Sequence, residues 1–215
     1  SYNIINAATA SPWATTTTEV SVWVGGTDDV SADGTGVFVN IVDNKMTGVG
    51  AASVGIEALI EGGSTPTSAN VAMNVLRNVL LVENENGNPM DVRGTISTRL
   101  QGTAFINTNM IVSENTLRSD YTTIQWSLRS YTSENSFINT NVTVGSNTIT
   151  GTNHADKAAT GIAGWILGVM SENSHLVASN NTIHNAQSGI RYTVDPRGYP
   201  IHHHCSIEII DNRVF

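Results

Sequence analysis

The chain has 215 residues, of which 40% are hydrophobic, 13% are charged and 6% are aromatic. This content is too apolar for a disordered protein and is sufficient for one sizeable core. The formal net charge is −8, and the only lysines are Lys45 and Lys157. Because non-specific binding to nucleic acid or to an anionic membrane needs clustered basic residues, neither partner is expected. No apolar run is long enough to cross a bilayer as a helix, so membrane insertion is not expected either.

Asn, Thr, Ser and Gly fill most of the polar positions, a composition that favours short strands joined by turns over helices. The single cysteine, Cys205, excludes an internal disulfide. No secretory signal is visible and the chain does not begin with Met, so we expect a processed product or an excised fragment.

Residues 1–36 form the first predicted segment, either irregular or the first coil or coils of a repeat. Thr15–Thr18 is a low-complexity patch, whereas Val20, Val22 and Val24 alternate as in a strand.

Residues 37–215 contain the repeat. The pentapeptide FINTN occurs at Phe105–Asn109 and again at Phe137–Asn141. A longer pattern, an apolar strand that runs into an Asn, aligns on Asn44, Asn84, Asn115, Asn147, Asn181 and Asn212. Successive members are separated by 31 to 40 residues, a period typical of stacked repeats.

The positions five and three residues before each Asn are apolar in every unit, and their period of two places both side chains on one face of a strand. They are Val39 and Ile41, Val79 and Leu81, Met110 and Val112, Val142 and Val144, Leu176 and Ala178, and Ile207 and Ile209. The position two residues after the Asn is also apolar in five units, as Met46, Leu117, Ile149, Ile183 and Val214, but is Asn86 in the sixth.

A second strand is predicted in most units. Its centre is Gly55-Ile56-Glu57, Met90-Asp91-Val92, Thr123-Ile124-Gln125, Gly161-Ile162-Ala163 and Gly189-Ile190-Arg191. Units this short cannot bury their own apolar face and must stack. A β-sandwich also uses short strands but gives no reason for the same residue at the same point of every unit.

We therefore predict an all-β, right-handed parallel β-helix of about six coils. The six Asn side chains are expected to form a hydrogen-bonded ladder and to accept the left-handed conformation of a tight corner. The chain stops in mid-coil at Phe215, so we also expect that it continues in a longer protein or that a partner covers its end.

The coils at Met110–Leu117, Val142–Ile149 and Leu176–Ile183 resemble those of the pectin-lyase-like β-helix superfamily. Within it, the Asn-, Thr- and Ser-rich, lysine-poor composition is most similar to bacteriophage tailspikes and related polysaccharide depolymerases. The resemblance covers residues 37–215. It implies a homotrimer on a virion surface or outside the cell that binds, and cleaves, bacterial capsule or O-antigen, without a cofactor.

The chain departs from the enzymes of this superfamily in its motifs. It lacks the NTD, paired-Asp, GHG and RxK motifs of polygalacturonases and the Arg-rich signatures of pectate lyases. No catalytic residue can therefore be transferred from the family. The missing motifs count against a third function, a secreted plant-polysaccharide enzyme, and leave two leading ones. The first is a glycoside hydrolase or polysaccharide lyase; the second is a non-catalytic adhesin or virion structural module.

The candidate catalytic pair is Glu57 and Asp91, which are predicted to occupy the same outward position on successive coils. Two carboxyl groups about 5 Å apart suit glycosidic hydrolysis, because like charges raise one pKa and give an acid and a base. Predicted saccharide contacts are the outward residues Arg93, Trp126, Arg129 and Tyr192 together with Arg191 and Arg197. Asp195–Tyr199 is long enough to form a projecting loop. A solvated flank without chemistry is the plain alternative.

His202-His203-His204-Cys205 is the only sequence that suggests a metal site. His202 and His204 share one face of a strand, whereas His203 and Cys205 have the parity of the inward Ile207. Two ligands without an identifiable third do not make a site, so no metal is predicted.

Overall fold

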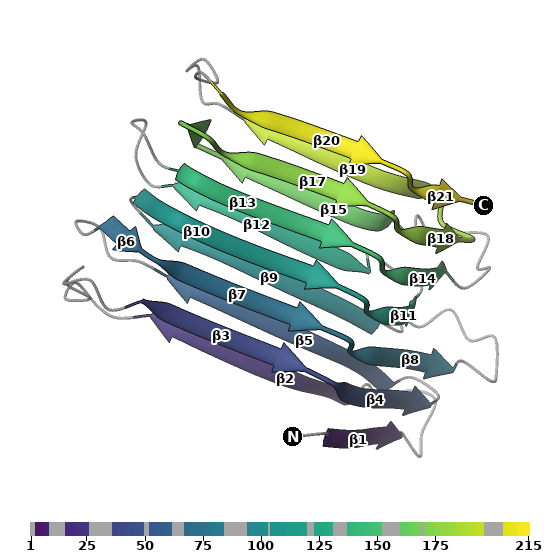
Figure 1. Cartoon of the computed structure of the whole chain (residues 1–215). Coiled ribbons are helices and arrows are strands. Elements are labelled where there is room, and N and C mark those ends of the chain that lie inside the picture. The colour runs from purple at the N-terminus through teal and green to yellow at the C-terminus, as the bar shows by residue number, and fades with distance from the viewer. Residues whose placement is uncertain are drawn as a thin grey trace.

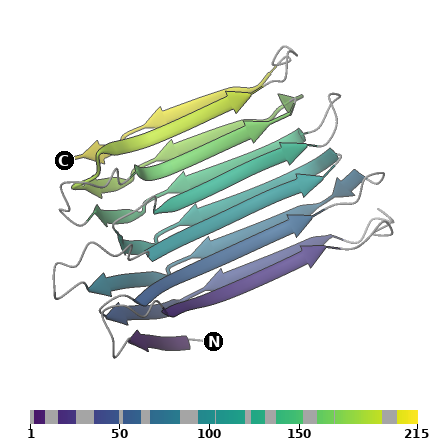
Figure 2. The same ribbon diagram turned by 180° about the vertical axis from the view of Figure 1, so that it is seen from behind.

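The computed structural model describes residues 3–8, 16–25, 36–49, 52–61, 67–83, 94–102, 104–119, 123–130, 137–151, 160–168, 170–195 and 204–215. These residues form three parallel sheets, and none of them is helical. Figures 1 and 2 show strands of successive coils lying side by side in a stack that runs from the N-terminus to the C-terminus.

Each sheet is named here by a letter, with its strands in spatial order. Sheet A contains β1 (Asn3–Ala8), β4 (Asn44–Val49), β8 (Val79–Glu83), β11 (Thr116–Ser119), β14 (Thr148–Gly151), β18 (Thr182–His184) and β21 (Arg213–Val214). Sheet B contains β2 (Thr16–Gly25), β5 (Ala52–Glu61), β9 (Gly94–Gly102), β12 (Ile124–Ser130), β15 (Thr160–Leu167) and β19 (Ser188–Asp195).

Sheet C contains β3 (Val37–Val42), β7 (Val71–Leu76), β10 (Ala104–Ser113), β13 (Phe137–Gly145), β17 (His175–Ser179) and β20 (Ser206–Ile210). Two short strands extend this sheet: β6 (Thr67–Ala69) pairs with β10, and β16 (Met170–Ser171) pairs with β13.

The chain passes from sheet C to sheet A to sheet B in each coil and then returns to sheet C (Figure 1). This path, with parallel pairing between coils, confirms the predicted β-helix and excludes an antiparallel sandwich. Slightly fewer complete three-strand coils are present than the six expected. β1 and β2, from the first 36 residues, pair with β4 and β5 and so belong to the same stack.

The buried Asn ladder is present, but one of its predicted members is wrong. The ladder runs through Asn44, Asn78, Asn115, Asn147, Asn181 and Asn212, so that Asn78 takes the place assigned to Asn84. In each step, the side-chain oxygen of one Asn accepts hydrogen bonds from the backbone and side-chain nitrogens of the Asn one coil earlier. For Asn115 and Asn147 both distances are 3.0 Å.

The corrected alignment also removes the exception at Asn86. Five and three residues before Asn78 lie Met73 and Val75, and two residues after it lies Leu80; all three are fully buried. The side chain that stacks between Met46 and Leu117 in sheet A is therefore Leu80. Asn84 and Asn86 lie outside the described residues.

The left-handed residue of this corner is not the ladder Asn but the residue before it. Positive φ angles of 53° to 59° occur at Asp43, Arg77, Glu114, Ser146, Asn180 and Asp211. A non-glycine residue in this region is strained, so the buried amide bonds that follow must hold the turn in place. The expectation that the ladder Asn itself adopts the left-handed conformation is wrong.

A second Asn ladder lies on the outside of the coil, eight residues before the first. It consists of Asn70, Asn107, Asn139 and Asn173, all with positive φ. The side-chain nitrogens of Asn107, Asn139 and Asn173 each donate to the side-chain oxygen of the Asn one coil earlier, at 3.1–3.5 Å. His204 has a positive φ at the same offset in the last coil. In these coils, one left-handed corner therefore precedes the longer part of the sheet C strand and the other follows it.

The core is built from inward columns that each contribute one residue per coil. In sheet C, Met73, Met110, Val142 and Leu176 form one such column, and all are at most 1% exposed. Ile207 belongs to the same column but is 41% exposed, because β20 is the last strand of sheet C. The inward parity predicted for Met110, Val142 and Leu176 is confirmed, whereas that predicted for Val79 and Leu81 is wrong, because Leu80 between them is the buried residue.

Candidate functional site

Three columns of side chains cover the outer face of sheet B. The first consists of Ser21, Glu57, Ser97, Gln125, Ala163 and Arg191; the second of Leu59, Arg99, Ser127, Trp165 and Thr193; the third of Glu61, Gln101, Arg129 and Leu167. Members of a column are one strand spacing apart, about 4.8 Å, so the face presents a regular array to a ligand.

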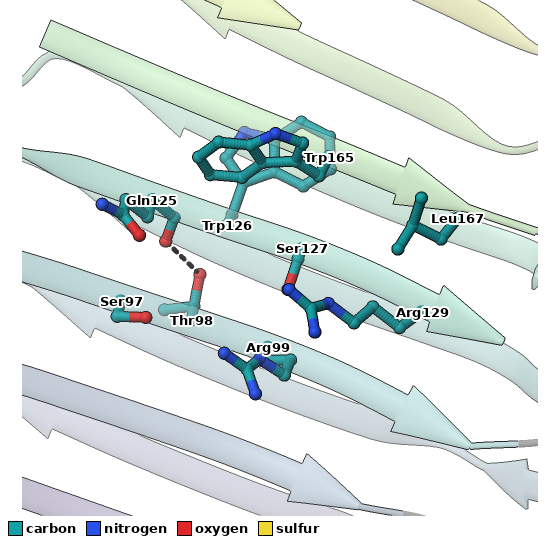
Figure 3. Close-up of a pocket in the computed structure, with 9 residues that line it drawn as sticks. All are labelled: Ser97, Thr98, Arg99, Gln125, Trp126, Ser127, Arg129, Trp165 and Leu167. Carbon is teal, nitrogen blue, oxygen red and sulfur yellow. Dashed lines mark hydrogen bonds between the residues drawn. The ribbon is translucent and has the colours of Figure 1, made fainter. Parts of the chain in front are cut away.

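A shallow pocket of about 160 Å³ lies on this face over β9, β12 and β15. Arg99, Gln125, Ser127, Arg129 and Trp165 supply its polar and aromatic groups. Figure 3 shows the Arg129 guanidinium close to Ser127, the Arg99 guanidinium over the strand on one side of it, and the Trp165 indole on the other side. The volume lies below the range of about 300–1,000 Å³ typical of sites that enclose a whole small molecule. The pocket is therefore suited to one unit of a longer ligand that lies across the face.

Trp126 does not lie on the outer surface, and that part of the prediction is wrong. It shares the parity of Ile124 and Leu128, is fully buried, and reaches the pocket only as part of its lining. Its indole occupies the space over Gly164, where an added Cβ would lie 2.2 Å from the ring. Only glycine leaves room for the tryptophan at this point of the next coil.

Tyr192 follows Gly164 in the same inward column and also differs from its predicted outward position. Its ring meets that of Trp126 edge to face, with centroids 5.1 Å apart, and it packs against the core. Burial raises the pKa of Tyr192 to about 12, and the adjacent Trp126 opposes this rise only in part. A direct contact of Tyr192 with a bound saccharide is therefore not favoured.

Glu57 lies in the first outward column, as predicted, but its neighbour on the next coil is Ser97 and not Asp91. The strand of sheet B in that coil is β9, which begins at Gly94, and Ile96 occupies the inward position assigned to Met90 or Val92. Asp91 lies outside the described residues. The geometric reason for pairing these two carboxyl groups is removed, and a catalytic role for either stays a prediction.

A different carboxyl group lies beside Glu57. Glu19, on β2, has a pKa above its usual value, mainly because it is partly buried and secondarily because of the charge of Glu57 and a hydrogen bond with it. Glu61 on the same strand accepts a hydrogen bond of 3.3 Å from Gln101. The carboxyl groups thus gather on β2 and β5, next to the pocket rather than in it.

Of the other residues that were predicted to contact a saccharide, two lie on the outer face of sheet B. Arg129 lines the pocket, and Arg191 is exposed at the end of the first column. Arg93, Arg197 and the loop after Asp195 lie outside the described residues. The sequence interpretation missed Arg99 and Trp165, although both lie an odd number of residues after an inward isoleucine, which is the parity of the outer face.

Within the described part of the chain, no three His, Cys, Asp or Glu side chains come close enough to hold a metal ion. Cys205 packs against the core, and His204 is exposed with a φ of 66°. His202 and His203 lie outside the described residues.

These features define the chain as a parallel β-helix with a polar and aromatic face on sheet B, an architecture compatible with the pectin-lyase-like fold. Searches with protein-family models, curated proteins and solved structures found no match to the chain. The described residues include no helix with the length and hydrophobicity that crossing a membrane would require.

Proposed function

We propose that the protein binds a polysaccharide along the outer face of sheet B. The observation that carries this proposal is the pocket, in which an indole, two guanidinium groups, an amide and a hydroxyl lie on neighbouring strands of one flat surface. Sugar rings pack their apolar face on aromatic rings and direct their hydroxyl groups to polar side chains. An array that repeats at the strand spacing suits a repeating ligand better than a compact one.

The identity of the polysaccharide rests on the sequence resemblance alone. It favours capsule or O-antigen of a bacterial surface, bound by a homotrimeric, tailspike-like protein on a virion or outside the cell. A non-catalytic adhesin or virion structural module with the same face binds the same class of ligand without cleaving it.

Cleavage of the bound polysaccharide is the second candidate function, and one observation favours it. Glu19 and Glu57 are adjacent, and the pKa of Glu19 is raised, which is the kind of difference that separates a general acid from an ionised carboxylate. Glu57 is paired in register with Ser97, which lines the pocket. A saccharide that occupies the pocket and extends toward β5 therefore reaches these carboxyl groups.

The proposal is tested by measuring the binding of the chain to a panel of immobilised bacterial polysaccharides. Trp165→Ala is expected to weaken binding by roughly tenfold or more, because a central tryptophan usually contributes strongly to an interface. Phe38→Ala is the matched control, since Phe38 is a 71% exposed aromatic residue of β3, outside sheet B. Equal losses in the two variants, or binding that is insensitive to both, would refute the assignment to sheet B.

Release of reducing ends separates the two functions. A depolymerase generates new reducing ends, and Glu57→Gln suppresses this activity while leaving binding unchanged. Binding without any release of reducing ends identifies the adhesin.

A further inference from the structure

We infer that the pocket on sheet B recognises an anionic group carried by a sugar, a carboxylate or a sulfate, and that Arg99 and Arg129 hold it. This inference rests on the proposed binding of a polysaccharide and specifies its chemical class. The chain as a whole has a net charge of −8 and repels an anionic ligand. Binding of an anion therefore depends on the charges that lie close to the two arginines.

The register places the two arginines on neighbouring strands. Arg99 is paired with Ser127, and Arg129 follows two residues later on the same strand and the same face. Figure 3 shows the Arg129 guanidinium beside Ser127 and the Arg99 guanidinium over the neighbouring strand. Because Arg99 and Ser127 are one strand spacing apart, an anion that binds between their strands lies next to both guanidinium groups and the hydroxyl of Ser127.

Among the residues that the structure describes, none that lines the pocket carries a carboxylate. Among the described residues, the ion pair that the structure forms is between Arg77 and Asp43, at the corner between sheets C and A. Arg99 is therefore not neutralised by a carboxylate of the described residues. Arg99 and Arg129 place two positive charges on neighbouring strands, and an anion between them is attracted to both.

The acidic residues of the face lie to one side of this position. Glu57 and Glu61 are on β5, and the nearest column partners of these two residues on β9 are Ser97 and Gln101. Glu61 already accepts a hydrogen bond from Gln101. Both carboxylates lie on the β5 side of Arg99, whereas Ser127 and Arg129 lie on its β12 side, so an anion between the two arginines is on the side away from them.

The ligand chemistry follows from the donors. A guanidinium presents N–H groups in a planar fork that matches the two oxygens of a carboxylate or of a sulfate, whereas a neutral hydroxyl uses only one of them. The Trp165 indole, also in the pocket lining, can pack against the ring of the same sugar or the next one. The favoured ligand is thus an acidic sugar within a polymer, such as a uronic acid or a sulfated hexose.

The experiment uses the full chain and four immobilised polysaccharides: one that contains uronic acid, the same polymer after reduction of its carboxyl groups, a sulfated one and a neutral one. We expect the native uronate polymer to bind roughly tenfold or more tightly than its carboxyl-reduced form. Arg99→Gln and Arg129→Gln are each expected to remove most of that difference, and Arg99→Lys to restore part of it.

Arg118→Gln is the matched control, because Arg118 is an exposed arginine on β11 of sheet A. Circular dichroism and the melting temperature of each variant exclude misfolding as the cause of a lost preference. Tight binding of the sulfated polymer alone identifies the anion as sulfate, and tight binding of the uronate polymer identifies it as carboxylate.

The inference is overturned if the uronate polymer binds no more tightly than its reduced form and the sulfated polymer binds no more tightly than the neutral one. It is also overturned if Arg118→Gln has the same effect as the pocket variants. Equal binding of neutral and acidic polymers leaves the proposed polysaccharide function intact. Failure to bind any polysaccharide overturns both.

Discussion

Replacing Asn147 with leucine tests whether the buried amide ladder stabilises the β-helix. The side-chain nitrogen of Asn147 donates to the backbone oxygen of Val112 at 3.0 Å and to the side-chain oxygen of Asn181 at 2.9 Å. Its own oxygen accepts from the backbone and side-chain nitrogens of Asn115, both at 3.0 Å. Leucine has a similar size but can make none of these four bonds.

The expected loss of stability follows from the number of buried polar groups that lose their hydrogen-bond partner. The substitution leaves the backbone N–H of Asn115 and one of its side-chain hydrogens without their acceptor, at a residue that is fully buried. Each such group costs about 1–3 kcal/mol, so the free energy of unfolding is expected to fall by about 2–6 kcal/mol. A domain has only about 5–15 kcal/mol in total, so the effect is large.

Urea denaturation followed by circular dichroism measures this change as a shift of the transition midpoint at constant slope. Asn141→Leu is the control, because Asn141 is an exposed asparagine on β13, the strand that precedes the corner at Asn147. It should change stability by no more than about 0.5 kcal/mol. If Asn147→Leu is as stable as this control, the ladder hydrogen bonds do not stabilise the fold and the reasoning fails.

Three further predictions concern the interior and the outer face of sheet B. Gly164→Ala should lower the free energy of unfolding by at least about 1–3 kcal/mol and change the tryptophan fluorescence, because the new methyl group would overlap the Trp126 ring; an unchanged melting temperature would contradict this packing. The raised pKa of Glu19, caused by burial and then by Glu57, means that the folded chain holds this proton to a higher pH than the unfolded chain, so stability falls as the pH rises above about 4.5. Glu19→Gln should therefore stabilise the chain at pH 7 and have no such effect below the unfolded pKa, as compared by urea titrations at the two pH values. In an ultraviolet titration, Tyr192 should ionise near pH 12, later than ordinary tyrosines, and Tyr192→Phe should remove that late component; a component that disappears near pH 10 instead would contradict its burial.

The fold was predictable because one corner of the coil has a fixed length. In each coil from β7 onward, sheet C passes to sheet A through a left-handed residue and the ladder Asn, so apolar residues recur at constant offsets from that Asn. The error at Asn84 arose because β8, Val79–Glu83, is itself apolar and can be mistaken for the strand before the corner. The polar residue at Asn86 was the sign of the wrong register, since Leu80 satisfies the pattern that Asn86 breaks.

The second ladder was present in the sequence but not interpreted. The repeated FINTN segments contain Asn107 and Asn139 at their centres, and Asn70 and Asn173 lie at the same offset of eight residues from their own ladder Asn. Repetition alone does not distinguish a buried amide from an exposed one. The exposed position needs the left-handed backbone, which Asn tolerates better than most residues, rather than the buried hydrogen bonds.

The outer face of sheet B could not be aligned from the ladder, because the connection from sheet A to sheet B varies in length. The inward isoleucine of sheet B follows the ladder Asn by 12, 18, 9, 15 and 9 residues in successive coils, at Ile56, Ile96, Ile124, Ile162 and Ile190. An offset that works for one coil therefore places the wrong residues in the next. This is how Asp91 came to be assigned to the position that Ser97 occupies.

The candidate site forms in spite of this variability in the length of the connections. Insertions between sheets A and B change the loops, yet backbone pairing keeps the strands of sheet B in continuous register from β2 to β19. Side chains that are far apart in sequence and differently spaced, such as Arg99 and Trp165, are then brought onto one flat face. The parity rule within each strand is local and survives these insertions, so it could have placed Trp126 inside and Arg129 outside once an inward isoleucine was chosen. What the rule cannot supply is which outward residues of different coils become neighbours, because that depends on hydrogen bonding between coils and not on spacing along the chain.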